Sequence, residues 1–252
     1  MGERMIPAYF NWSGGKDSSL ALYYLLQNPD FDIKALVTTV NEEHQRISMH
    51  GVRRELLHEQ AKQIGIPVQE ILLPDSPNMS DYETAMNKGL QPLLDQGIRH
   101  CAFGDIFLED LRQYRENKLS EIGVEAIFPL WKRDTRELIE TFIDLGFKTV
   151  VVCTQADKLD ESFVGRTIDR DFLNDLPPDV DPCGENGEFH TFVYDGPIFQ
   201  QPLKFELGEK VFRTYGKQNE NENENENDVC GGEANVIPGF HYIDLVSLIK
   251  SD

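Results

Sequence analysis

The chain has 252 residues, 40% of them hydrophobic and 10% aromatic, which is enough to bury a large core in one domain or in a domain with a smaller appendage. Acidic residues outnumber basic ones by 44 to 24, a formal net charge of −20, which argues against general nucleic-acid binding because phosphate contacts need clustered cations. No apolar run approaches the roughly 20 residues of a membrane-spanning helix, and no apolar leader is present, so we expect a cytoplasmic protein without membrane contact.

The first half of the chain alternates strand-like and helix-like segments, as βαβ units do. Strands are predicted at residues 8–12, 34–40, 68–73, 100–106, 124–131 and 148–154. Helices are predicted at residues 18–27, 50–65, 81–96, 109–122 and 134–145, with Ser80 as the N-cap of the third and Gly65 as the C-cap of the second. The pattern predicts a Rossmann-like, mostly parallel sheet, which binds ligands at the carboxyl ends of its strands.

The second half reads as a smaller α+β domain. A helix is predicted at residues 163–176, and strands of an antiparallel region at 189–194, 203–207, 210–215 and 240–245. We divide the chain into residues 1–131 and 132–252, although the strand at 148–154 fits either side. The strict Asn-Glu alternation at 219–227 has no apolar face and predicts a disordered insert over 217–235.

The cysteines indicate a reducing environment. None of the four forms a C-x-x-C pair, so neither a zinc knuckle nor a disulfide framework is indicated. Cys101 and Cys153 stand in apolar runs and are expected in the core, whereas Cys183 begins the glycine-rich loop described below.

The motif Ser13-Gly14-Gly15-Lys16-Asp17-Ser18 joins the first strand to the first helix. Its glycines let the backbone approach a phosphate closely, and the helix N-terminus, two hydroxyls and a lysine supply positive charge and donors. Asp17 repels a phosphate unless a magnesium ion lies between them, so a magnesium–polyphosphate complex suits the whole motif. The spacing differs from that of a Walker A loop.

A second constellation, Gly184-Glu185-Asn186-Gly187-Glu188-Phe189-His190-Thr191, crowds two carboxylates and an imidazole on a glycine-hinged loop that enters a strand. Such a group can orient an ammonium ion, take a proton from it, or bind the polar end of a substrate. A polar turn with its acids in water explains the residues equally well.

The first motif resembles the PP-loop of the ATP pyrophosphatases, which have an adenine nucleotide alpha-hydrolase-like fold. The combination of motifs resembles the diphthine–ammonia ligase family. It consists of the first motif, the second constellation, Pro129-Leu130-Trp131, Asp195-Gly196-Pro197 and the closing Tyr242-Ile243-Asp244-Leu245. The resemblance implies ATP and Mg²⁺ as cofactors and a carboxyl adenylate as intermediate. The products would be AMP, pyrophosphate and an amide whose nitrogen comes from ammonium.

The resemblance also implies roles for individual residues. Ser13, Gly14, Gly15, Lys16, Asp17 and Ser18 would hold pyrophosphate, with Lys16 and Asp17 catalytic and Asp17 on the metal. Glu185, Glu188 and His190 would line the acceptor or ammonium site in the second domain. His50, Gly51, Gly104 and Asp105 would lie at the nucleotide, although His50 also fits a helix cap and Asp105 a solvated helix start.

The acceptor carboxylate is left open. It is the diphthine of elongation factor 2 if the host makes diphthamide, and otherwise an unknown small molecule. The stretch 104–115 departs from the family's pattern after the fourth strand, which bears on that choice. A PP-loop ATPase with another acceptor, a tRNA-thiolating enzyme and a non-catalytic nucleotide sensor are alternatives, and the oligomeric state is not indicated.

Overall fold

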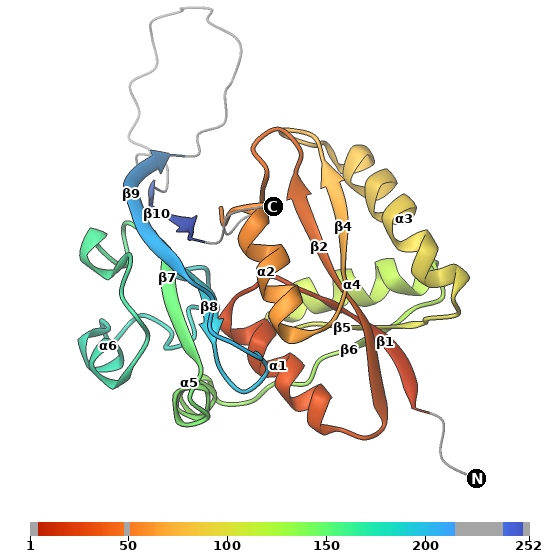
Figure 1. The fold of residues 1–252 in the computed structure, drawn as a ribbon, viewed down its shortest axis with the longest axis horizontal. Coiled ribbons are helices and arrows are strands. Elements are labelled where there is room, and N and C mark those ends of the chain that lie inside the picture. Colours follow the sequence, from red (N-terminus) through yellow and green to blue (C-terminus); the bar gives the residue numbers. More distant parts are fainter. Residues whose placement is uncertain (1–4, 48–50, 215–238, 249–252) are drawn as a thin grey trace, which may run out of the picture.

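A computed structural model describes residues 5–47, 51–214 and 239–248. Figure 1 shows two sheets side by side, sheet A in the first half of the chain and sheet B in the second. The strands of sheet A are β1 (Ile6–Asn11), β2 (Phe31–Asn41), β3 (Arg46–Ile47), β4 (Val68–Leu73), β5 (His100–Ala102) and β6 (Glu125–Ile127).

The parallel strands of sheet A run in the order β4-β2-β1-β5-β6, and β3 folds back antiparallel on the end of β2. The chain therefore builds outward from β1 to β4 and then returns to the other side of β1. This reversal makes the carboxyl ends of β1 and β5 a topological switch point, where open α/β sheets bind their ligands. The Ser13–Ser18 motif follows β1 at this point.

Helices cover both faces of sheet A (Figure 1). They are α1 (Lys16–Gln27), α2 (Arg54–Ile64), α3 (Met79–Asp95) and α4 (Glu109–Glu121). Alternation along β1 explains the two layers, because Ala8 and Phe10 join the core of α1 and α2, whereas Tyr9 joins the core of α3 and α4.

Sheet B is antiparallel, in the order β8-β7-β10-β9. Its elements are β7 (Lys148–Gln155), β8 (Phe189–Asp195), β9 (Phe205–Thr214) and β10 (Gly239–Ser247), with α5 (Thr135–Asp144), the 3-10 turn η1 (Glu161–Phe163) and α6 (Arg170–Asp175) around it. Val150 and Phe192 of sheet B share one buried core with Leu57 of α2. The predicted Rossmann-like sheet with a smaller α+β part is thus confirmed, and the strand at 148–154 belongs to sheet B.

The helix predicted at 163–176 is wrong over its first part, and only α6 near its end is helical. Asp160 caps the turn η1, Asp169 caps the separate helix α6, and the residues between them run alongside β7. Backbone bonds from Gly165 N–H to Val151 O (2.8 Å) and from Val151 N–H to Arg166 O (2.9 Å) hold that stretch extended. Tertiary pairing has overridden helical spacing here.

Other boundaries also differ from the predictions. The two strands expected at 203–207 and 210–215 are one strand. Gly208 and Glu209 continue it at a shift in the register of its pairing with β10. The second helix begins at Arg54 instead of residue 50, since Val52 pairs with Ile47 in a hairpin. The N-cap of α3 is Asn78, whose side chain accepts from the Asp81 amide at 2.9 Å, and not Ser80.

The fourth and fifth strands are shorter than predicted, since β5 ends before Gly104 packs on α1 and β6 gives way to a turn at Phe128–Trp131. Cys101 and Cys153 are buried in the core, as predicted. Within the described ranges, no helix is long and apolar enough to cross a bilayer. His50 and the insert predicted at 217–235 lie outside the described residues.

Candidate functional site

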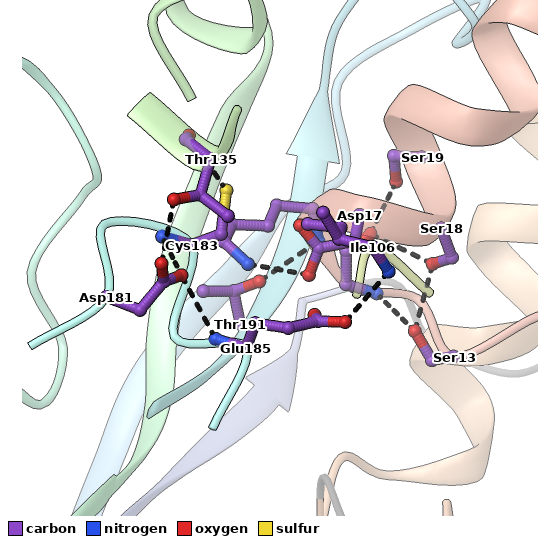
Figure 2. Close-up of polar contacts among 12 residues, drawn as sticks. Ser13, Asp17, Ser18, Ser19, Ile106, Thr135, Asp181, Cys183, Glu185 and Thr191 are labelled. Carbon is purple, nitrogen blue, oxygen red and sulfur yellow. Dashed lines mark hydrogen bonds and ion pairs between the residues drawn. The ribbon is translucent and has the colours of Figure 1, made fainter. Parts of the chain in front are cut away.

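The loop from Ser13 to Ser18 forms a small cradle of donors at the switch point. The Ser13 and Ser18 hydroxyls lie 2.9 Å apart, and the Gly15 amide donates to Ser13 Oγ at 3.2 Å (Figure 2). Gly14 has φ +78°, a backbone conformation that glycine adopts without strain. Helix α1 starts at Lys16 directly after the loop, so its partial positive charge faces the cradle.

Lys16 and Asp17 form an ion pair beside this cradle. Lys16 Nζ lies 2.6 Å from Asp17 Oδ2, and the lysine side chain is 4% exposed while that of Asp17 is 29% exposed. Burial lowers the pKa of Lys16, but the carboxylates of Asp17 and Glu185 outweigh it, so the pKa stays above its usual value. The lysine is therefore a permanent cation, and its ammonium also lies 5.4 Å from the Phe189 ring centroid.

Glu185, from the second constellation, lies near the charges of Lys16 and Asp17. Its Oε1 accepts from the Ile106 amide at 2.8 Å, which joins this loop to the segment after β5 (Figure 2). Burial, followed by the negative charge of Asp17, raises the pKa of Glu185 to about 7. A carboxyl with that pKa exchanges protons near neutrality, as a general base must.

The segment after β5 brings Gly104 and Asp105 to the site. A Cβ on Gly104 would lie 2.8 Å from Ser18 N, so glycine is needed where this backbone crosses the first turn of α1. Asp105 Oδ2 lies 3.0 Å from Arg115 Nε of α4. Burial raises the pKa of Asp105, and the nearby charge of Asp17 adds to the shift. The carboxyls of Asp17, Asp105 and Glu185 thus lie near one another, with Lys16 paired to Asp17 and Arg115 paired to Asp105, so acids outnumber cations in this cluster.

Glu188 turns into its own loop. Its Oε1 accepts from the Asp181 amide (3.1 Å) and from Asn186 Nδ2 (3.0 Å), its Oε2 accepts from the Asn186 amide (2.9 Å), and the residue is 3% exposed. Alternation along β8 places His190 on the opposite face of the strand from Phe189 and Thr191. The catalytic roles given to Glu188 and His190 stay predictions.

Sheet B contacts the loop through a set of neutral hydrogen bonds, which we call the Gly14 junction. It comprises Gly14, Lys16 N–H, Gln60, Thr191 and Val193. Lys16 N–H donates to Thr191 Oγ1 at 3.0 Å, and Val193 N–H donates to Gly14 O at 2.9 Å. Gln60 of α2 donates to Gly14 O (3.0 Å) and to Val193 O (2.6 Å). The edge of β8 therefore packs directly against the loop.

A second contact between the sheets, the Asp244 latch, comprises Asp244 of β10, Arg46 and Arg53. Asp244 accepts from Arg46 Nη1 at 2.9 Å and from Arg53 Nη2 at 2.6 Å. Arg46 Nη1 also donates to Gly51 O at 2.6 Å. The structure thus places Gly51 in the hairpin held by the latch, close to Tyr242, and not in the Lys16 cluster.

A cavity of about 510 Å³ opens beside the loop, between sheet A and the pair α3 and α4. Trp12 and Ser13 reach it from the loop, and Val37 and Ile47 line it from β2 and β3. Arg115 lies at the same cavity, stacked on Phe103 at 4.3 Å. An apolar cavity adjoining an anion cradle suits a ligand with a flat apolar part and a charged tail.

Three polar residues of the site were not predicted: Gln60, Asp181 and Arg115. Gln60 carried the clearest signal, because it lies in the buried stripe of α2 with Leu56, Leu57 and Ala61, where helical spacing favours an apolar side chain. Asp181 holds the second constellation to α5 by accepting from Thr135 Oγ1 at 2.7 Å. Within the described residues, no group of three or more His, Cys, Asp or Glu side chains is arranged to hold a metal ion.

The doubly wound sheet and the glycine-rich anion loop at its switch point define an α/β protein of the nucleotide-binding type. Comparison with known families identifies the family. A family model described as diphthamide synthase N-terminal domain matches residues 8–126, and one described as diphthamide synthase C-terminal domain matches residues 134–222. The chain belongs to the diphthamide synthase family, and the resemblance found in the sequence is confirmed.

Individual relatives agree with this family. A protein of Saccharomyces cerevisiae named diphthine–ammonia ligase is 26% identical over 225 residues, covering 75% of this chain and 33% of that protein. The human protein of the same name is 27% identical over 113 residues, covering 42% of each chain. The chain therefore matches less than half of the length of either relative.

Proposed function

We propose that the chain is an ATP-dependent amide-forming ligase that joins ammonium to a carboxylate and releases AMP and pyrophosphate. In the first step a carboxylate oxygen attacks the α-phosphorus of ATP and pyrophosphate leaves. In the second step ammonia attacks the acyl carbon and AMP leaves with the C–O bonding electrons. The observation that carries the proposal is the donor cradle of Ser13–Ser18, faced by Glu185 with a pKa of about 7.

The cradle binds the pyrophosphate part of ATP in this proposal. Ser13, Gly15 and Ser18 donate to its oxygens, and the permanent cation of Lys16 offsets charge on the leaving group. Asp17 fits a magnesium ion that phosphates also hold, since Mg²⁺ is commonly bound by one or two carboxylates together with substrate phosphates. When bound, the ion supplies charge neutralisation to the polyphosphate.

Adenosine occupies the 510 Å³ cavity, which begins at Trp12 and Ser13 and has apolar walls from Val37 and Ile47. Ile47 of the hairpin that contains Gly51 lines this cavity, so we keep Gly51 as a candidate residue near the adenosine. In this proposal the acceptor and ammonium approach from the loop that carries Glu185.

Ammonium must lose a proton before its nitrogen can attack. Glu185 suits that task, because it is ionised above about pH 7 and lies among the charges of Lys16, Asp17 and Asp105. A cluster with excess negative charge also attracts a small cation. We assign Glu188 to holding the loop that carries Glu185, since both of its oxygens accept from that loop.

The acceptor we propose is diphthine on elongation factor 2, by analogy with the names of the relatives, in a cytoplasmic enzyme. The test is to incubate the full chain with ATP, magnesium, ammonium and diphthine-bearing elongation factor 2, with the unmodified factor and an Asp17→Asn variant as controls. Mass spectrometry should show a hydroxyl replaced by an amino group on the modified factor alone. AMP formation without amidated factor would show a different acceptor, and nucleotide binding without AMP would indicate a sensor.

A further inference from the structure

Gln60 occupies a position that the chemistry proposed above does not explain. It is completely buried in α2, yet each polar atom of its side-chain amide has a partner. Oε1 accepts from Trp12 Nε1 at 3.1 Å, and Nε2 donates to Gly14 O at 3.0 Å and to Val193 O at 2.6 Å. Since an amide has two N–H donors, both are used, and this network fixes its orientation.

The carbonyl of Gly14 receives two donors. Val193 N–H reaches it at 2.9 Å from the edge of β8, and Gln60 Nε2 reaches it from α2. Together they occupy both lone pairs of the oxygen, so this carbonyl is held toward α2 and β8. A Cβ on Gly14 would lie 2.7 Å from Gln60 Oε1, which shows how closely the two residues approach.

The direction of this carbonyl sets the direction of the next amide. In a trans peptide the C=O and the following N–H point in opposite directions, so Gly15 N–H points away from Gln60 and into the cradle. There it donates to Ser13 Oγ at 3.2 Å. If the peptide turned over, a carbonyl oxygen would face the bound anion, and repulsion would replace a hydrogen bond.

The cradle depends on Gly15 because the next amide is already engaged. Lys16 N–H, the first amide of α1, donates to Thr191 Oγ1 at 3.0 Å. Gly15 N–H, by contrast, donates to the hydroxyl oxygen of Ser13, which an oxygen of a bound anion can replace. Gly15 O is also fixed, accepting from Ser19 N–H (3.0 Å) and Ser19 Oγ (2.9 Å).

We propose that Gln60 is a positioning residue that orients the Gly14–Gly15 peptide so that Gly15 N–H binds the pyrophosphate group of the nucleotide. The inference rests on the proposed function, since it requires a pyrophosphate in the cradle. It also assigns sheet B a part in nucleotide binding, because Val193 of β8 supplies the second donor to Gly14 O.

The test compares pyrophosphate binding by the full-length wild type and three variants, measured calorimetrically with magnesium present. Gln60→Met keeps the length of the side chain and removes both donors. Gln63→Met is the matched control, since Gln63 lies on the same helix and its amide bonds to Glu59 and not to the loop. Leu57→Ala disturbs the same buried stripe of α2 but leaves every hydrogen bond of the Gln60 amide in place.

We expect Gln60→Met to bind pyrophosphate at least tenfold more weakly than wild type, while Gln63→Met and Leu57→Ala stay within about threefold, whatever their melting temperatures. Equal losses in Gln60→Met and Leu57→Ala would overturn the proposal, since destabilised packing would then explain both. Unchanged affinity in Gln60→Met would overturn it as well.

A measurement on the wild type does not depend on any variant folding. Titrating ¹⁵N-labelled protein with pyrophosphate should shift the Gly15 amide proton strongly downfield, as a new bond to an anion does. A Gly15 signal that stays in place while other loop signals move would contradict the role of Gln60 alone. If no signal moves and no heat is released, the proposed function fails and this inference with it.

Discussion

The two contacts between sheets A and B differ in chemistry and in what they hold. The Gly14 junction is buried and neutral, with Gln60 and Thr191 at 0% and 2% exposure. The Asp244 latch is ionic and partly exposed, with side-chain exposures of 21% for Asp244, 35% for Arg46 and 38% for Arg53. Buried hydrogen bonds fix the direction of a peptide, whereas an ion pair in partial contact with water fixes position loosely and is weakened by salt.

The difference between the two contacts matches the needs of the regions that each contact holds. The junction holds the loop whose amide and hydroxyl donors must meet phosphate oxygens with little freedom. The latch holds the hairpin whose Ile47 lines an apolar cavity, where directional demands are smaller. We therefore expect changes around the loop to alter turnover and changes at the latch to leave turnover nearly unchanged.

The largest effect is expected for Glu185→Gln, which removes the proposed base. Loss of a general base typically costs roughly 10²–10⁴ in rate. In the wild type, kcat should rise through about pH 7, where Glu185 ionises, and this limb should vanish in the variant. Glu188→Gln is the matched control, and loss of the limb in that variant instead would restore the base role predicted for Glu188.

Glu185 also makes a prediction about stability. Its pKa is raised in the folded protein, so the native state binds a proton more readily than the unfolded chain between the unfolded pKa and about pH 7. The free energy of unfolding of the wild type should therefore fall as pH rises through this window, and more steeply than that of Glu185→Gln. Denaturant titrations at pH 5 and pH 8 measure the difference, and parallel slopes would contradict the assignment.

The same substitution, Asp to Asn, can be made at Asp17 in the loop and at Asp244 in the latch, and the two variants compare the effects of the two regions on turnover. Removing a charge that acts on the transition state costs about 10²-fold in turnover. We expect that loss of AMP formation for Asp17→Asn, measured below its melting temperature, which should fall because the buried Lys16 loses its closest counter-charge. The Asp244 variant should keep its turnover within a few-fold, and a comparable loss there would show that the latch shapes the reactive site.

Thr191→Val tests the junction itself. The substitution keeps the shape of the side chain but leaves the buried Lys16 N–H without its acceptor, at a cost of about 1–3 kcal/mol in the free energy of unfolding. The loss should be the same in low and high salt, since the bond is neutral. A loss that disappears in 1 M NaCl would mean that charge, and not this hydrogen bond, governs the junction.

Asp244→Asn is expected to have the smallest effect on stability, about 1 kcal/mol at low ionic strength and less in high salt. Burial alone raises the pKa of Asp244, but hydrogen bonds from Arg53 and Arg46 leave it below its usual value. The contribution of the latch is therefore present above the unfolded pKa and is lost as pH falls through the folded pKa. Denaturant titrations from pH 2 to pH 7 should converge for wild type and variant at the acid end.

Local patterns predicted much of the fold. Residues 68–73 and the αL cap at Gly65 agree with the structure because alternation and glycine chemistry act over a few residues. The prediction of a helix over 163–176 failed at residues 164–168, which turn back after η1 and pair with β7. The hairpin of Ile47 and Val52 was missed for the same reason, since tertiary context decides such short pairings.

The site divides in a similar way. Ser13–Ser18 and Glu185 were recognisable because their residue types are unusual for a turn. The contacts of Gln60 with Gly14 and Val193 join residues 46 and 133 positions apart, and a single sequence contains no record of such distances. A glutamine in the buried stripe of a helix was the one local sign of this role.

The most direct test of the account is to identify the phosphorus-containing products of ATP turnover by ³¹P NMR, with magnesium, ammonium and the diphthine-bearing factor present. Cleavage between the α and β phosphates should give AMP and pyrophosphate in amounts equal to the amide formed, and Asp17→Asn should form both about 10²-fold more slowly. Formation of ADP and inorganic phosphate would contradict the account, because the cradle would then serve attack at the γ-phosphorus.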